Sequence, residues 1–390
     1  MDLSLIRQEA ERAFDDVVGY YRALHRIPEP SFEEYKTTEY IREKLKEMSI
    51  EPMSLDKTGC IAYIGSSRDR TPVIALRADI DGLPVKEETG CSFASVHEGR
   101  MHACGHDGHM AALLGAAGVL KSMEKDLPVR VKLIFQASEE KADGALRLLE
   151  RGVTDDVDAI FGLHLFSDIP TGVISLEEGP RMAQTEFFKV IFTGKGGHAA
   201  KPHLTVDATL MASAFVLDLQ TLVSRETDPT DAAVVTIGSF RSGSQYNVIS
   251  EEAVLEGTCR CYSSEISNRL EAGIRRKAES AALSYRGSAK VEYIGACHPP
   301  VSNDGDLTRK INSTARLMLG EEKFRSVKPL MLGEDFAWYQ TKVPGAFAFV
   351  GCGKPGQPVY PNHHGRFAID PPALKDALLM HLSAVLSFCR

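Results

Sequence analysis

Apolar residues along the chain recur with a helical period in some stretches and form short continuous runs in others. Over residues 2–26 they recur at helical spacing, which predicts one amphipathic helix that the following prolines end. Ser31 and Glu34 have the spacing of a capping box, so we predict a second helix from Ser31 to about Met48. Short apolar runs then alternate with helical patterns: runs at 72–76, 131–135 and 159–163, helices at 109–123 and 143–151.

This alternation of strands and helices predicts an α/β domain with a mixed, mostly parallel sheet flanked by helices. Each of the three apolar runs leads into a group of polar or titratable residues. In open α/β sheets, ligands bind just beyond the carboxyl ends of the strands. We therefore expect the polar groups around residues 79, 104, 139 and 164 to meet at one site.

The pattern changes near residue 183. Strands at 187–193, 233–240, 251–262 and 289–294 and helices at 206–223 and 265–285 follow the order βαββαβ. That order is typical of a ferredoxin-like α+β fold, which predicts a small domain inserted into the larger one. The predicted parts are a catalytic domain in two pieces, 1–183 and 299–390, and an inserted domain at 184–298. Within the last piece we predict a loop at 351–356 and a closing helix at 372–389.

Composition narrows the possible functions. The net charge is −8 and no run of five Lys or Arg occurs, so nothing predicts a nucleic-acid partner. No stretch of 18 apolar residues and no signal-peptide pattern is seen, so no membrane span is expected. The eight cysteines have no disulfide-like spacing, which favours reduced thiols in the cytoplasm. We interpret Cys259 and Cys261, two apart in a predicted strand, as buried residues rather than a metal pair.

Residues 101–109 (MHACGHDGH) hold the densest group of reactive side chains in the chain. Thiol and imidazole groups of this kind bind zinc, manganese, cobalt or nickel. Cys104 and His106 flank Gly105, so both side chains can face one ion. Either residue alone would more simply be a buried side chain, and only the other polar clusters favour a metal site.

Glu139 and Glu140 follow the second apolar run after three intervening residues. Adjacent side chains diverge, so one carboxylate can ligate a metal while the other takes a proton from a water molecule. Two surface glutamates that open a helix are an equally simple interpretation of the pair. His198, in a Gly-rich stretch after the first strand of the inserted domain, would in isolation be an exposed turn residue.

Nine sequence motifs occur along the chain in the order RADIDGLP, MHACGHDGH, LIFQASEE, FGLHLF, TGKGGHAAKPH, QYNVIS, EGTCR, LGEDFAWY and HHGRF. The chain resembles the metal-dependent amidohydrolases of the aminoacylase/carboxypeptidase superfamily. The most similar branch contains hippurate hydrolase, indole-acetyl-amino-acid hydrolases and bacterial N-acetyl-amino-acid deacetylases. The resemblance implies a zinc-peptidase-like catalytic domain with an inserted lid and dimerisation domain.

The resemblance also implies two divalent metal ions per subunit, most simply manganese or zinc, with cobalt or nickel as alternatives. The implied ligands are Cys104, His106, Glu140, His164 and His363. His363 is chosen over His364 because the family's ligand lies four residues before a Phe, here Phe367. Glu139 is implied as the general acid/base and Asp81 as the residue that orients a ligand. Asp79 stands where more distant members have a ligand His.

In the inserted domain, the resemblance implies that His198 and Asn247 stabilise the scissile carbonyl and that Arg260 pairs with a substrate carboxylate. In relatives that His comes from the partner subunit, so a homodimer formed through the inserted domain is expected. The predicted reaction is hydrolysis of N-acyl-L-amino acids, such as N-acetyl or hippurate-like compounds, to a carboxylate and a free amino acid. A dipeptidase, an N-acetyl-diamino-acid deacetylase and, more remotely, a non-catalytic metal-binding scaffold are the alternatives.

Overall fold

The computed structural model describes residues 2–66 and 71–389, and the chain folds into two compact units, each with its own hydrophobic core. The first unit contains the described residues up to Arg181, together with Ser302–Lys328 and Asp335 onward. The second unit contains Met182–Val301 and also Pro329–Glu334. Residues 329–334, which the sequence predicted to be part of the catalytic domain, thus belong to the second unit instead.

A seven-stranded mixed sheet forms the centre of the first unit, with strand order β1-β2-β4-β3-β5-β15-β6. The four strands β4, β3, β5 and β15 pair in parallel, and the outer pairs are antiparallel. This confirms the predicted α/β class with a mostly parallel sheet. The bounds are β1 Pro52–Met53, β2 Cys60–Ile64, β3 Val73–Asp79, β4 Arg130–Gln136, β5 Ala159–Pro170, β6 Ile174–Ser175 and β15 Gly345–Gly353.

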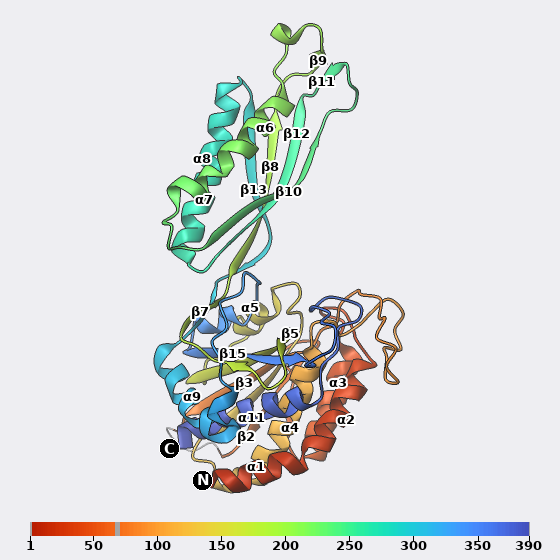
Figure 1. Cartoon of the computed structure of the whole chain (residues 1–390), viewed down its shortest axis with the longest axis vertical. Helices are drawn as coiled ribbons and strands as arrows, with labels where there is room; N and C mark the ends of the chain where they lie inside the picture. Colours follow the sequence, from red (N-terminus) through yellow and green to blue (C-terminus); the bar gives the residue numbers. More distant parts are fainter. Residues whose placement is uncertain (1, 67–70, 390) are drawn as a thin grey trace. The chain divides into compact units, whose positions relative to one another are not determined.

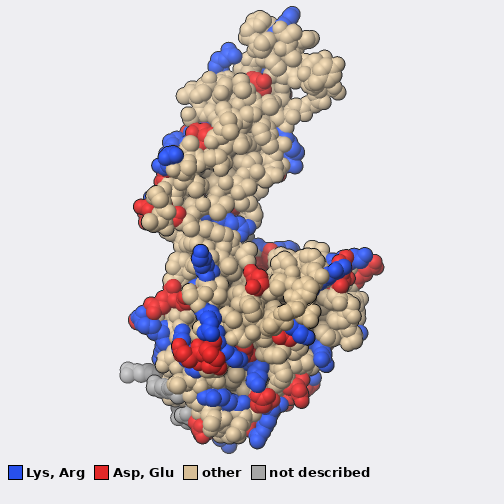
Figure 2. Space-filling view, in the orientation of Figure 1, with Lys and Arg blue, Asp and Glu red and all other residues tan. Residues whose placement is uncertain are grey.

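Helices cover this sheet (Figure 1). They are α1 Leu3–Arg12, α2 Phe14–His25, α3 Tyr35–Glu47, α4 His106–Ser122, α5 Gly144–Leu149, α9 Gly305–Leu319, α10 Ala337–Gln340 and α11 Pro372–Leu386, with 3-10 turns at Glu124–Asp126, Glu321–Lys323 and Ser387–Cys389. α4 is buried along nearly its whole length and packs against α2 and α11. Figure 2 shows basic and acidic side chains interspersed over the visible face of this unit.

One segment of the described chain, Pro372–Cys389, is long and apolar enough to cross a membrane by length and composition. Within the protein, however, 78% of it is buried, and its helix α11 packs against α4, α9 and β15. A helix buried in this way belongs to the core of a globular domain.

Three sequence expectations for the first unit were wrong in detail. The predicted helix 2–26 is interrupted at Ala13 and forms α1 and α2. The predicted loop 351–356 instead begins as the last three residues of β15. Its glycines allow close backbone contact with β5, since a Cβ at Gly351 would lie 2.1 Å from the carbonyl oxygen of Pro170.

The capping-box prediction was also wrong, because α3 begins at Tyr35 and not at Ser31. Glu34 occupies the cap position without capping the helix through its side chain. The Ser31 hydroxyl donates a 2.7 Å hydrogen bond to Asp81 instead. Both polar side chains of the motif are therefore used in tertiary contacts.

The second unit is a four-stranded antiparallel sheet with order β10-β12-β8-β13. Its strands are β8 Gln184–Thr193, β10 Ala233–Ser242, β12 Glu252–Cys261 and β13 Ser288–His298, and its helices are α6 Ala208–Leu219, α7 Thr221–Glu226 and α8 Ser264–Ser284. The single helix predicted at 206–223 is thus two helices. Cys259 and Cys261 are buried on β12 as predicted, 2% and 1% exposed.

Shorter elements complete the description: β9 Gly197–His198, which pairs with β11 Val248–Ile249; β7 Gly179–Met182, which pairs with β14 Val301–Asn303; and a 3-10 turn at Pro202–Leu204.

Candidate metal centre

The centre of the first unit is built where strands end and α4 begins. β3 ends at Asp79 and β4 at Gln136, while His164 lies within β5 beside them. Gly105, with φ of 93°, turns the chain into α4 so that Cys104 and His106 precede and open the helix. A residue with a side chain would be strained at this backbone conformation.

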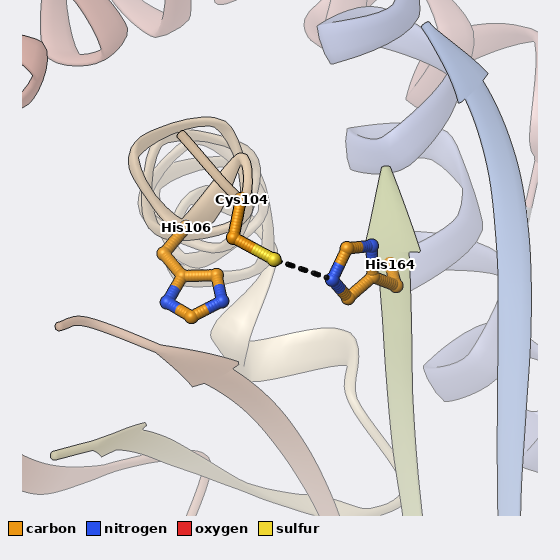
Figure 3. Close-up of side chains that lie close together, drawn as sticks. All are labelled: Cys104, His106 and His164. Atoms are coloured by element: carbon orange, nitrogen blue, oxygen red, sulfur yellow. Dashed lines mark hydrogen bonds between the residues drawn. The ribbon is translucent and has the colours of Figure 1, made fainter. Parts of the chain in front are cut away.

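All five predicted metal ligands meet here. The Cys104 sulfur lies 3.4 Å from His164 Nε2 and 3.3 Å from His363 Nε2 (Figure 3 shows the first contact). His363 Nε2 in turn lies 3.4 Å from a Glu140 oxygen. Ligand bonds of about 2.0 Å to nitrogen and 2.3 Å to sulfur place neighbouring ligand atoms roughly 3.5 Å apart. The observed separations are of that size.

These donors form two overlapping groups, Cys104 with His106 and His164, and Cys104 with Glu140 and His363. A third group joins His106 to Glu139 and Glu140. Cys104 belongs to two of the groups and His106 to two. Two overlapping groups of this kind could hold two ions that share Cys104.

His106 shows most clearly that the residues of this centre suit a metal ion. Its Nδ1 lies 2.9 Å from the Asp81 carbonyl oxygen and 3.3 Å from the Asp81 carboxylate, so that nitrogen carries the proton. Its Nε2 is buried and has no hydrogen-bond partner within the described residues. Carboxylate oxygens of Glu139 and Glu140 lie 4.0 and 3.9 Å away. A free, buried ring nitrogen that faces carboxylates fits a metal ion.

The protonation of the side chains in the centre depends on burial and on their neighbours. Contacts with the Cys104 thiol and the Glu140 carboxylate raise the pKa of His363 to about 10. Burial and the nearby Glu140 carboxylate raise the pKa of the Cys104 thiol. Burial lowers the pKa of His164 well below its ordinary value. A cation that replaces these protons would hold the thiolate, the carboxylate and the neutral imidazoles together.

The loop with His363 is held in a strained conformation. His363 has φ of 70°, in the left-handed region that residues with side chains rarely adopt. Its N–H donates to the Ala103 carbonyl oxygen at 2.7 Å. The Asn362 side chain donates to the carbonyls of Cys104 and Leu165, at 3.0 and 3.1 Å. These hydrogen bonds hold the loop of His363 next to Cys104, so the last predicted ligand lies beside the first.

A second layer of buried residues surrounds the ligands. His109 Nδ1 lies 2.6 Å from Asp79, and His109 Nε2 accepts a hydrogen bond from the Leu165 N–H at 2.9 Å. Both nitrogens of His109 are thus used, so it is not a ligand. The Arg77 guanidinium contacts both Asp79 and Asp335 at 2.7 and 2.8 Å. This buried hydrogen-bond network holds Asp79 and His109 in place beside the predicted ligands.

Sequence reasoning missed Arg77, Asn362 and Asp335 as parts of this layer. The RADIDGLP and LGEDF motifs contain Arg77 and Asp335, but no local pattern pairs residues 258 positions apart.

Glu139 and Glu140 lie in a turn after β4, and the next helix, α5, begins only at Gly144. The interpretation of the pair as two residues that open a helix is therefore wrong. Both backbone N–H groups donate to the Asp81 carboxylate, at 3.2 and 3.1 Å. Asp81 thus contacts both His106 and the turn.

Three predicted site residues belong to the second unit. His198 is exposed on β9, and its Nδ1 accepts a hydrogen bond from the Ala200 N–H at 3.0 Å. Asn247 is the residue before β11 and accepts a bond from the Ala199 N–H at 3.0 Å. The β9–β11 pair therefore brings His198 and Asn247 close together within this unit. Arg260 lies on β12, and its guanidinium donates to the Met331 carbonyl oxygen.

Fold and site together define a metal-dependent hydrolase: an α/β sheet whose strand ends present thiolate, imidazole and carboxylate donors beside an extra glutamate. The family model described as "Peptidase family M20/M25/M40" matches residues 75–386, and the chain belongs to this family. It is an amide-bond hydrolase.

Curated relatives cover nearly the whole chain. An N-acetyl-L-cysteine deacetylase of Bacillus subtilis is 41% identical over 92% of this chain and 84% of its own length. The IAA-amino acid hydrolase ILR1-like 4 of Arabidopsis thaliana is 38% identical over 95% of this chain and 85% of its own. An N-acetyldiaminopimelate deacetylase of Streptococcus uberis is 37% identical over 93% of this chain and 96% of its own.

Solved structures agree with the fold. A putative aminohydrolase from methicillin-resistant Staphylococcus aureus is 33% identical, covers 99% of both chains and has a TM-score of 0.92. A Bacillus subtilis protein described as a dinuclear metal binding peptidase of the M20 family is 36% identical, covers 97% of this chain and 99% of its own, and has a TM-score of 0.85.

Proposed function

We propose that this enzyme hydrolyses the amide bond of N-acyl-L-amino acids with two divalent metal ions, releasing a carboxylate and a free amino acid. The observation that carries the proposal is the pair of donor groups that share Cys104, one of which contains the buried, unpartnered Nε2 of His106. Relatives whose names specify N-acetyl and indole-acetyl amino acids support the substrate class.

The ligands in this proposal are Cys104, His106, Glu140, His164 and His363. When bound, the ions supply a Lewis acid for the carbonyl and lower the pKa of water towards about 7. Glu139 takes the proton of the attacking water and delivers it to the leaving nitrogen. Asp81 accepts hydrogen bonds from the Glu139 and Glu140 N–H groups, which holds the base and the ligand in one turn.

We further propose that His198 and Asn247 stabilise the oxyanion that develops on the carbonyl. Loss of one such donor typically costs roughly 10²–10³-fold in rate. Arg260 is proposed to pair with the substrate carboxylate, because a guanidinium can bind it through two hydrogen bonds. Movement of the second unit as a lid is part of the same proposal.

Manganese or zinc is the proposed native metal, with cobalt or nickel as alternatives, since a mixed thiolate, imidazole and carboxylate set suits all four. Elemental analysis of protein purified without added metal identifies it. A reducing compartment, the cytoplasm, is proposed because all eight cysteines are free, including Cys104.

A homodimer through the second unit is proposed as well. Large apolar side chains are exposed on this unit, with Leu217 76% and Leu210 50% exposed on α6 and Phe240 40% exposed on the edge strand β10. Most of the exposed large apolar side chains lie on this unit, which favours a protein partner, and a second copy of the chain is the simplest.

The test is an activity screen of protein reconstituted separately with each metal. The panel contains N-acetyl-L-cysteine, N-benzoylglycine, an indole-acetyl amino acid, N-acetyl-diaminopimelate and a dipeptide. Hydrolysis of the N-acyl monoamino acids is expected to be the most efficient. The similarity to N-acetyldiaminopimelate deacetylases makes that activity the second candidate, and preference for that substrate or for the dipeptide would contradict the first.

A further inference from the structure

The turn that carries the proposed base and a proposed ligand is held by two buried carboxylates from elsewhere in the chain. Three successive N–H groups, those of Ser138, Glu139 and Glu140, point to them. The Ser138 N–H donates to Glu34 at 2.9 Å, and the next two donate to Asp81 at 3.2 and 3.1 Å. We call residues 138–140 the catalytic turn.

Backbone geometry explains why the turn presents its N–H groups in this way. Ser138 has φ of 59°, in the left-handed region. Such a residue directs successive N–H groups to one side and forms a concave anion-binding backbone. Here the groups that accept these hydrogen bonds are carboxyl side chains of the protein itself. A strained conformation at a non-glycine residue persists only when its surroundings determine it.

The segment 29–38 supplies most of these surroundings. Glu34 is fully buried and Ser31 is 7% exposed. The Ser31 hydroxyl donates to Asp81 Oδ2 at 2.7 Å, the same oxygen that accepts the Glu140 N–H. The Gly82 N–H donates to the Glu29 carbonyl oxygen at 2.7 Å, which ties this segment to the chain just after Asp81.

We infer that Ser31 and Glu34 are positioning residues, which hold the catalytic turn so that Glu139 and Glu140 reach the metal centre in a fixed geometry. Neither side chain contacts a donor atom of the centre in this structure; they act through Asp81 and through the backbone of the turn. The segment precedes the part of the chain that matches the family model, residues 75–386. A position error of about 1 Å in a reacting group can cost roughly 100-fold in rate.

The chain offers a matched set of variants for the test. Glu34→Ala removes the acceptor of the Ser138 N–H, whereas Glu34→Gln keeps an oxygen of the same reach. Glu33→Ala removes the neighbouring carboxylate, which is exposed. Ser31→Ala removes only one hydroxyl and serves if Glu34→Ala fails to fold.

The first measurement is hydrogen–deuterium exchange of the peptide spanning residues 136–144 in the metal-loaded enzyme. Exchange should be faster in Glu34→Ala and Ser31→Ala, and close to wild type in Glu34→Gln and Glu33→Ala. A peptide from α8 in the second unit is the internal control and should not change. Unchanged exchange in both Glu34→Ala and Ser31→Ala would overturn the inference.

The second measurement is kinetic and rests on the proposed function, with Glu139 as the base. On the best substrate of the panel, kcat of Glu34→Ala should fall roughly 10- to 100-fold with KM within about twofold. Glu34→Gln should recover most of kcat, and metal content should stay at the wild-type value. Equal loss in Glu34→Ala and Glu34→Gln would overturn a positioning role, and metal content of the same preparations distinguishes displacement of Glu139 from displacement of Glu140. The exchange measurement needs no turnover, so failure of the proposed function and failure of this inference are distinguishable.

Discussion

At the scale of single residues, Cys104 is the side chain on which the proposed metal centre depends most. Its sulfur contacts both His164 and His363, from strands and loops far apart in sequence. A thiolate is a stronger ligand for borderline metals than the oxygen of a serine or a water molecule. Its oxidation would remove a donor common to both groups of ligands.

We predict that Cys104→Ala weakens metal binding and that Cys104→Asp, which restores an anionic donor, recovers part of it. Elemental analysis after dialysis measures both variants, with Cys352→Ala, which lies in β15, as a control for loss of a buried cysteine. Wild-type metal content in Cys104→Ala would show that the ligands are others.

We predict that Glu139→Gln retains its metal and loses turnover. The amide has the size of the carboxylate but cannot take a proton, and such a loss of general base typically costs roughly 10²–10⁴-fold. Steady-state kinetics and metal content on the same preparation check this. Turnover within a few-fold of wild type would exclude Glu139 as the base.

How far single residues could be predicted depended on how local their signal was. Cys104 and His106 stand in one dense motif, and the resemblance added Glu140, His164 and His363, all of which the structure brings together. Arg77 and Asp335 could not be predicted, because their role exists only when two distant segments meet. The resemblance showed that Asp79 stands where more distant members have a ligand His. Its contact with His109 could be found only in the folded structure.

At the scale of elements, α4 connects the centre to the core. It begins at His106, and its body is buried between α2, α11 and the sheet. Glycines along α4 differ sharply in their surroundings. A Cβ at Gly115 would lie 2.3 Å from Val17 and 2.6 Å from Leu378, whereas one at Gly118 would meet only Met48 at 3.6 Å.

These two positions give a paired prediction. Gly118→Ala should raise the free energy of unfolding by about 0.5–1 kcal/mol, because alanine is a better helix former and finds space. Gly115→Ala should lower it by about 1–3 kcal/mol, because the added methyl overpacks the helix interface. Urea denaturation of both variants measures the difference, and stabilisation by Gly115→Ala would contradict the packing described.

Helices and strands could be predicted where the apolar pattern was long. Their prediction failed where tertiary contacts override local sequence signals. The parallel strands β3, β4 and β5 were found because they are continuous apolar runs. The capping box failed because Ser31 and Glu34 bond to distant groups, which no helix-start rule includes. The glycines of residues 351–353 indicated a loop, but they allow close contact between two strands.

At the scale of the whole molecule, the chain has two cores, and the inserted unit has exposed apolar residues that its own fold does not cover. The proposed dimer would cover them. Leu217→Glu on α6 should therefore convert the dimer to a monomer, measured by light scattering. Leu5→Glu, on α1 of the first unit and 51% exposed, is the matched control and should stay dimeric. A wild-type monomer would sink the proposal.

A subunit-mixing experiment tests whether His198 acts across the dimer. Subunits with Glu139→Gln and with His198→Ala are each expected to be inactive. A verified heterodimer of the two should regain activity, because one of its sites has both residues intact. No recovery would exclude action across subunits.

The separation of the ligands along the chain has a consequence for biosynthesis. Cys104 meets a residue 259 positions later, in a loop whose left-handed backbone is held by bonds to residues 103 and 104. The proposed centre therefore cannot be completed until the chain has been made at least as far as His363 and β15 has joined the sheet. If the five proposed donors bind the metal, a nascent or truncated chain that ends before His363 lacks one of them, so complete metal binding would distinguish the folded protein from such a chain.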